Sequence, residues 1–238
     1  MSTHLKALAK RTNPKTISVF PLKGSMLLSG CELPLNIFEP RYLNMIDDAL
    51  KTDRLIGMLQ PLADAHENPQ QSEMNTVGGL GRIVQFAETE DGRYMVVLKG
   101  LKRFRMIETA DMPTPYLQAH ISFDEFQNDI DVHDKVTMPE AFNTEKSERS
   151  ALIMAMKSYA KTLGVQLDWN SMKEIGLNRL VDQAAMISPF GVEDKQSLLE
   201  AKTHSERRRL LIGLMHLHSD TDLYSQSSSN DDNGPTLQ

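Results

Sequence analysis

The residues best suited to chemistry stand together in one short segment, Glu39-Pro40-Arg41-Tyr42. A carboxylate, a guanidinium and a phenol are side chains from which acid–base or anion-binding sites are built. The same segment could instead begin a helix, because proline is tolerated best at the first helical position. The residues before it alternate as in a strand, and residues 40–52 carry apolar side chains at helical spacing. The segment is therefore predicted to lie at a strand-to-helix junction, with either a catalytic or a structural role.

Other candidate catalytic or metal-binding groups are dispersed along the chain. The seven histidines form no pair spaced for metal binding on a helix, so a metal site would need convergence in the tertiary structure. Cys31 has no histidine near it in sequence, although a catalytic partner could lie elsewhere in the chain. Glu88, Glu90 and Asp91 are expected at an exposed hairpin tip, where the pKa of a carboxyl is not raised for acid catalysis. We predict no catalytic residue, no cofactor and no metal.

One further motif resembles a phosphate-binding loop only superficially. The sequence GGLG, from Gly78 to Gly81, precedes a predicted strand and not a helix. We therefore interpret its glycines as permitting a bulge or a tight start to the strand, and not as a phosphate loop. Neither a G-x-x-x-x-G-K-[ST] motif nor a G-x-S-x-G motif occurs.

Basic residues cluster at two places. In 99–105 they are Lys99, Lys102, Arg103 and Arg105. On a strand Arg103 and Arg105 share a face and Phe104 points the other way, so we expect a half-buried strand with a solvated basic face. The alternative is a small patch for an anion or a nucleic acid. The second cluster, in 206–211, is expected on the solvent side of an amphipathic helix. The chain is also rich in methionine, for which core packing is the default expectation, as at Met154, Met156 and Met215.

Composition limits the class of protein. The 238 residues are 40% hydrophobic and 24% charged, with a net charge of −6. Four basic residues and no acid stand in residues 1–15, so the rest of the chain is more acidic still, which argues against nucleic-acid binding. No apolar run approaches a membrane span, and no secretory signal or disulfide is expected from this sequence. These features indicate a cytoplasmic protein that does not bind membranes.

The periodicity of apolar residues predicts an α+β protein with two subdomains in sequence. The expected strands are 16–22, 25–30, 32–38, 54–61, a hairpin over 79–100 turning at Asp91-Gly92, 101–108 and 116–123. The expected helices are 40–52, 144–164, one opened by Ser171–Glu174 and ending before Ser188-Pro189, and one opened by Thr203–Glu206. The corresponding parts are a flexible basic arm (1–15), a β-rich barrel (16–125), a connecting segment (126–143), a helical bundle (144–218) and a disordered acidic tail (219–238).

One family matches these motifs in order. The segment from Phe20 to Leu50, with "FPL" followed by "LPLNIFEPRY", resembles the N-terminal substrate-recognising domain of the Lon ATP-dependent protease. "GGLGRIVQF", "VVLKGLKRFRMIE" and "KQSLLEAKTHSERRRLL" resemble later parts of that domain, so the likeness runs over residues 16–218. The residues that carry it are Phe20, Pro21, Leu22, Pro34, Leu35, Ile37, Phe38, Glu39, Pro40, Arg41, Tyr42, Gly79, Gly81, Gly100, Arg103 and Phe104.

The resemblance implies a partly open barrel of about six strands with one helix, followed by a helical bundle. It implies a non-catalytic module that binds unfolded or tagged polypeptide segments, alone or with a proteolytic or chaperone partner. The Lon ATPase and protease modules have no counterpart in these residues, so we expect a free-standing Lon-domain protein. It also implies a structural role for Glu39-Pro40-Arg41, with Arg41 clamping Glu39 and with Phe38 and Tyr42 packed between sheet and helix.

Two binding modes remain open: an apolar segment in a groove between the subdomains, or strand addition at an open barrel edge. The polar loop 61–77 is the expected variable rim. An enzyme whose site forms by tertiary convergence, and a structural subunit of a larger complex, are the alternative functions. The resemblance does not identify the peptide-binding residues or the oligomeric state.

Overall fold

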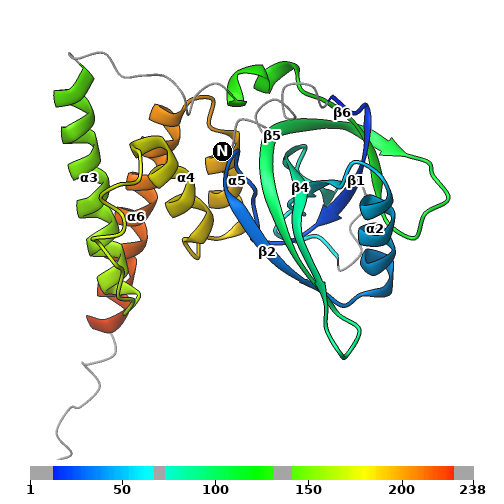
Figure 1. Cartoon of the computed structure of the whole chain (residues 1–238). Coiled ribbons are helices and arrows are strands. Elements are labelled where there is room, and N and C mark those ends of the chain that lie inside the picture. The colour runs from blue at the N-terminus through cyan, green and yellow to red at the C-terminus, as the bar shows by residue number, and fades with distance from the viewer. Residues whose placement is uncertain (1–12, 67–72, 131–140, 228–238) are drawn as a thin grey trace, which may run out of the picture. The chain divides into compact units, whose positions relative to one another are not determined.

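Six strands form one mixed sheet that curls into a nearly closed ring (Figure 1). The computed structural model describes residues 13–66, 73–130 and 141–227. The strands are β1 (Thr16–Pro21), β2 (Glu32–Ile37), β3 (Leu55–Leu59), β4 (Val77–Glu88), β5 (Tyr94–Ala110) and β6 (Gln118–Ser122). Their order is β2-β5-β4-β3-β1-β6, and pairing of β5 with β6 closes the ring. The predicted α+β fold with a partly open barrel is confirmed.

The long strand β5 allows the ring to close. Residues 94–99 pair with β2, residues 105–110 pair with β6, and β4 runs along the opposite edge of β5. The hairpin was predicted to end at 100 and a new strand to begin at 101, but β5 is continuous through this point. A single strand of this length can pair with β2 at one end and with β6 at the other. No local sequence pattern reveals these pairings. The predicted turn is confirmed, since Gly92 has a positive φ of 78°.

Helix α2 (Pro40–Lys51) packs its apolar side against the ring. Tyr42, Met45, Ile46 and Ala49 are buried in one cluster with Ile37. The chain enters α2 directly from β2, and Pro40 occupies the start of the helix as predicted. The core of the barrel thereby holds the strand-to-helix junction in place.

Residues 25–30, which were predicted to form a strand, form an irregular segment instead. Met26, Leu27 and Leu28 are almost fully buried, yet residues 25–30 form no strand. Their backbone lies against the sheet: the Gly30 N–H donates to the Gly100 carbonyl at 2.8 Å, and the Gly100 N–H donates to the Cys31 carbonyl at 2.9 Å. The strand prediction for 25–30 is wrong because a continuous apolar run signals burial and does not specify the backbone conformation.

The chain divides into two compact units that do not follow each other in sequence. One contains residues 1–135 and 182–200, and the other contains residues 136–181 and 201–238. The helices are α3 (Ala141–Thr162), α4 (Leu177–Ile187), α5 (Val192–Glu200) and α6 (His204–Ser227). The expectation of a sequential bundle over 144–218 therefore differs from the structure, because α5 and most of α4 group with the barrel. Helix α6 also includes the first part of the predicted acidic tail.

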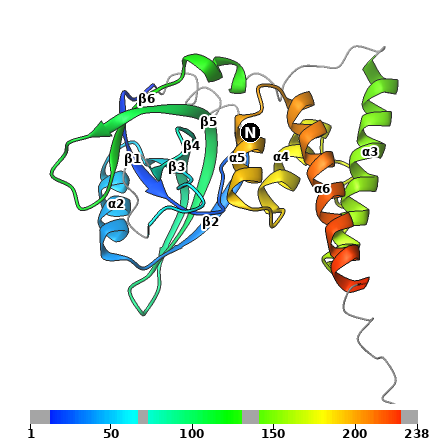
Figure 2. The same cartoon turned by 180° about the vertical axis from the view of Figure 1, so that it is seen from behind.

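In the second unit, α3 and α6 lie side by side (Figure 2). The predicted capping residue of α6 is confirmed: the Thr203 hydroxyl accepts the Glu206 N–H at 3.1 Å. The predicted helix start at Ser171 is wrong, because α4 begins at Leu177. The Arg149 guanidinium instead binds carbonyls of the preceding turn, including that of Ile175 at 2.7 Å, which holds those carbonyls away from helical partners.

In the second unit, one residue predicted in the core is exposed, and two residues predicted at the surface are buried. Met156 and Met215 are buried as predicted, but Met154 is exposed, because it lies on the opposite side of α3. The basic cluster of α6 was expected in solvent, yet Arg207 and Arg208 are buried. Arg208 forms an ion pair with Glu148, so its charge is buried with a partner.

Candidate functional site

In the junction segment, Glu39 to Tyr42, the two charged side chains pair with each other. Arg41 Nε donates to Glu39 Oε2 at 3.0 Å, and its guanidinium lies 4.6 Å from the centre of the Tyr42 ring. The Tyr42 ring is buried 4.4 Å from that of Phe20, and burial raises the pKa of its phenol. Glu39 stands at the N-cap of α2 but makes no side-chain cap. The clamp predicted between Arg41 and Glu39 is present, and the geometry favours a structural role for this segment.

The glycines of the signature allow the irregular buried segment to reach the sheet. A Cβ on Gly79 would lie 2.0 Å from the Leu27 carbonyl oxygen, and one on Gly100 would lie 2.0 Å from that of Leu28. Gly81 is similarly crowded by the Leu27 side chain at 2.6 Å. At Gly79 and Gly100 a side chain is therefore excluded by backbone, whereas at Gly81 it would have to displace the Leu27 side chain. The GGLG motif is a packing feature, and the pairing of β4 with β5 shifts register between Leu80 and Gly81.

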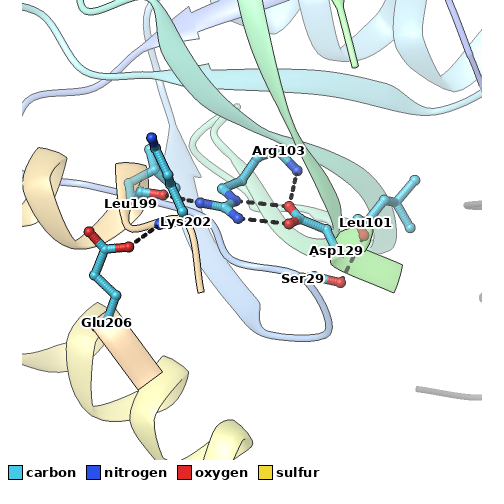
Figure 3. A network of polar contacts seen from close by, with 7 residues as sticks. All are labelled: Ser29, Leu101, Arg103, Asp129, Leu199, Lys202 and Glu206. Carbon is cyan, nitrogen blue, oxygen red and sulfur yellow. Dashed lines mark hydrogen bonds and ion pairs between the residues drawn. The ribbon is translucent and has the colours of Figure 1, made fainter. Parts of the chain in front are cut away.

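Three of the four basic residues of β5, Lys99, Lys102 and Arg103, are buried, contrary to the predicted solvated face, whereas Arg105 is partly exposed. Arg103 donates to both carboxylate oxygens of Asp129, at 2.9 Å from Nε and 2.8 Å from Nη2 (Figure 3). Its Nη1 donates to the carbonyl of Leu199 at 2.7 Å. Phe104 points to the other side, into the core, as predicted. The sequence missed this network because Asp129 lies in η2 (Asp124–Ile130) and Leu199 in α5, both remote from β5 in sequence.

An exposed apolar surface lies on the outer face of β2, β5 and β4. In the sheet register Pro34 is opposite Val97, and Asn36 and Ala87 flank Met95. The alternate residues Leu35, Ile37, Val96 and Leu98 are buried, so the first set faces outward. We call its apolar members the outer apolar strip: Pro34, Phe38, Ala87, Met95 and Val97.

Phe38 and Met95 provide the largest exposed side chains of the strip. Phe38 is 64% exposed and Met95 is 44% exposed. Phe38 follows Ile37 at the end of β2, so alternation directs it outward, and the prediction that it packs between sheet and helix is wrong. The sequence carries a signal of this strip. Residues 95–98 are apolar at every position, which gives both faces of β5 apolar side chains.

Two strand edges border the strip. Among the described strands, β2 pairs only with β5, and its exposed Pro34 blunts that edge, since proline has no N–H to donate. Strand β4 pairs with β3 only over Gly79–Arg82, so residues 84–88 have an edge without a described partner strand. Val84 and Phe86 on this part of β4 are exposed. The β4 edge is therefore better suited than β2 to accept an added strand.

The remaining candidate groups do not converge. No group of three or more His, Cys, Asp or Glu residues suited to a metal occurs within residues 13–66, 73–130 and 141–227. Cys31 is buried, and His120 contacts the Thr16 hydroxyl at 2.9 Å. Only part of loop 61–77 is described, its ends joined by a bridge between Pro61 and Met74, and residues 67–72 of the predicted rim lie outside the described residues. No helix of the described chain is long and apolar enough to span a membrane.

Comparison with known proteins identifies the family. Residues 16–216 match the model described as the ATP-dependent protease La (LON) substrate-binding domain. The chain is 27% identical over 208 residues to Lon protease of Anaeromyxobacter dehalogenans (strain 2CP-C), which covers 87% of this chain and 24% of that protein. It is 26% identical over 219 residues to Lon protease 2 of Myxococcus xanthus, with coverages of 87% and 24%. The chain thus spans about a quarter of the length of these curated relatives.

Solved structures show the same fold. The N-terminal domain of Mycobacterium avium complex Lon protease aligns with a TM-score of 0.59 at 18% identity, covering 86% of this chain and 100% of that one. The Lon N-terminal domain protein from Xanthomonas campestris aligns with a TM-score of 0.54 at 21% identity, covering 84% and 98%. At these identities the structures support the fold alone. Together with the match over residues 16–216, they place this chain in the Lon substrate-binding domain family.

Proposed function

We propose that this protein is a polypeptide-binding module that holds unfolded or exposed chain segments on its outer apolar strip. The observation that carries the proposal is an exposed apolar surface on a domain of the Lon substrate-binding family. Apolar side chains buried inside folded proteins become available in unfolded ones, and these can cover the strip. Handing bound chains to a proteolytic or chaperone partner belongs to the same proposal.

The strip favours loose selectivity over recognition of one sequence. It mixes a flexible methionine with a phenylalanine and smaller residues, and methionine adapts to differently shaped partners. The polar side chains Asn36 and Gln85 share the same face and can bind the peptide groups of an extended chain. The edge of β4 at residues 84–88, which has no partner strand among the described residues, offers main-chain hydrogen bonds to a segment lying alongside it. None of these contacts requires a particular side chain in the ligand.

The test is a binding titration with a permanently unfolded polypeptide. A disulfide protein that has been reduced and alkylated serves as the ligand, and the same protein in its native state serves as the control. We expect saturable binding of the unfolded form, measured by fluorescence anisotropy of the labelled ligand, and much weaker binding of the native form. Equal binding of both forms, or none at ~100 μM, a regime of roughly −5 kcal/mol, would refute the proposal.

Surface variants locate the binding site. Phe38→Ser and Met95→Ser combined should weaken binding at least ~10-fold, because each removes an exposed apolar anchor and the typical anchor is worth more than about 1 kcal/mol. Met154→Ser is the matched control, since Met154 is an equally exposed apolar side chain on α3. A double variant that binds like wild type would exclude the strip, and so would a Met154→Ser variant with the same loss.

A further inference from the structure

A cavity of about 920 Å³ lies in the barrel unit, away from the residues of the outer apolar strip. The segment that precedes β1, the middle of β5, β6 and η2 all contribute to its wall. Its lining residues are Asn13, Pro14, Lys15, Lys102, His120, Ile121, Ser122, Phe123, Asp124 and Gln127. The volume is in the range typical of ligand sites, and its wall combines apolar and polar side chains.

Lys102 is the charged residue most deeply set in this wall. The residue is only 5% exposed. Its Nζ donates to the Asn13 side-chain oxygen at 2.6 Å and lies 3.9 Å from the centre of the Phe123 ring. An amide oxygen and a ring face are neutral partners, so they compensate a buried ammonium less completely than a carboxylate does.

The other basic side chains of β5 show the contrast. Lys99 pairs with Glu32 at 2.9 Å, Arg103 pairs with Asp129, and Arg105 pairs with the carboxylate of Glu125. For Lys102, no carboxylate within the described parts of the chain lies at ion-pair distance from Nζ. The strand therefore carries four basic residues, of which three are matched by carboxylates and the fourth faces a cavity.

The surrounding charges favour an anion in this cavity. Lys15 also lines it and adds a positive charge. The acid in the wall, Asp124, already accepts a hydrogen bond from the Ser122 hydroxyl at 2.8 Å. Burial is the main influence on Lys102 and lowers the pKa of its amine, an effect that a bound anion would oppose. Asp129, which does not line the cavity, acts against this lowering of the Lys102 pKa through its charge but is held by Arg103.

We propose that this cavity binds a carboxylate group, with the Lys102 ammonium as its ion-pair partner. The carboxylate is one that a polypeptide presents, either at its C-terminus or on an acidic side chain. In that respect the proposal rests on the proposed polypeptide-binding function, and it adds a second, polar contact point to the apolar one. Asn13 and Gln127 supply amide N–H groups that can bind the second carboxylate oxygen.

Three short peptides test the proposal on the full chain. All are unlabelled, N-acetylated hexapeptides of Gly, Ala and Ser, titrated by calorimetry: one with a free C-terminal carboxylate, one amidated, and one amidated with an internal Glu. We expect one or both carboxylate-bearing peptides to bind at least ~10-fold more tightly than the neutral peptide, the lower range for a charge-assisted hydrogen bond. Which of the two binds identifies the source of the carboxylate. Equal binding of all three, or binding of none, overturns the proposal.

Variants on the same strand assign the effect to Lys102. Lys102→Gln should abolish the preference for the carboxylate, whereas Lys99→Gln, which removes the same charge from β5, should keep it. A Lys102→Gln variant that retains the preference overturns the proposal. Because Lys102→Gln could misfold, wild-type protein is also titrated with sodium acetate against sodium chloride at equal ionic strength. Saturable NMR shifts at the amides of Lys102 and Ser122 support the site, and their absence overturns it.

The two proposals can fail separately. The hexapeptides contain no large apolar side chain, so the Phe38→Ser and Met95→Ser double variant should bind them like wild type. If the unfolded polypeptide does not bind but the carboxylate preference is present, the outer apolar strip is refuted and the Lys102 site stands. If the unfolded polypeptide binds and the peptides show no preference, the Lys102 site is refuted and the strip stands.

Discussion

The buried pair of Arg103 and Asp129 gives the sharpest prediction about stability. Its side chains are 6% and 12% exposed, and the carboxylate accepts three N–H groups of Arg103, including the backbone N–H at 2.9 Å. Asp129→Asn removes the carboxylate that is paired with the buried guanidinium. Removing one partner of a buried ion pair costs about 3–5 kcal/mol. We therefore expect Asp129→Asn to reduce the free energy of unfolding of the barrel unit by about 3 kcal/mol or more.

The neighbouring pair on the same strand is the matched control. Arg105 and Glu125 are 37% and 52% exposed, so water and salt screen their interaction. Glu125→Gln should cost no more than about 1 kcal/mol. The two substitutions remove the same kind of charge from the same short helical segment, η2. The difference between them isolates the effect of burial.

Hydrogen exchange of the β5 amides measures both variants within the barrel unit. The single tryptophan, Trp169, lies in the other unit, so its fluorescence would not report on this one. Slowly exchanging amides in β5 should lose protection in Asp129→Asn and keep it in Glu125→Gln. Equal losses in the two variants, or a loss below about 1 kcal/mol in Asp129→Asn, would refute the reasoning. Replacing both Arg103 and Asp129 with apolar residues should recover part of the loss, because no unpaired charge then remains buried.

Three further predictions concern backbone packing, pH dependence and helix capping. Gly79→Ala should lower the free energy of unfolding, measured in urea, by about 3 kcal/mol or more, since its Cβ would meet backbone at 2.0 Å. Gly213 is in an open helical position, so Gly213→Ala should instead stabilise the protein by up to ~1 kcal/mol. Burial lowers the pKa of Lys195 below its ordinary value of 10.5. Between these two values only the unfolded chain keeps the proton, so wild type should gain stability relative to Lys195→Met as the pH rises through this range. A difference in stability that does not change with pH would contradict this. Thr203→Ala should cost about 1 kcal/mol through loss of the α6 cap, and unchanged exchange at the Glu206 amide would count against it.

Local patterns were enough to predict most elements of the barrel. Pro40 at the start of α2, the Asp91-Gly92 turn and the alternation in β2 each depend on residues within a few positions of one another. Local sterics and hydrogen bonding control such features, so they can be read from the sequence. The family motif can also be recognised from local sequence, because its glycines and prolines mark backbone positions that few residues can occupy.

Predictions of exposure failed where burial depended on a partner remote in sequence. Arg103 has the charge typical of a surface residue, but in the folded protein it is buried against Asp129 and the Leu199 carbonyl. Met154 looks like a core residue, although α3 turns this side chain to solvent. A single sequence shows which residues are apolar or charged, but which side of an element is covered depends on its neighbours.

The candidate sites divide in the same way. The sequence by itself determined the family, the order of strands before helices, and the presence of an apolar run at residues 95–98 and a basic run at 99–105. Only the tertiary structure decided that Met95 joins Phe38 on one exposed face and that Lys102 faces a cavity while its neighbours find carboxylates. The reason is physical: composition and spacing act over a few residues, whereas burial and ion pairing arise between segments that only the folded chain brings together.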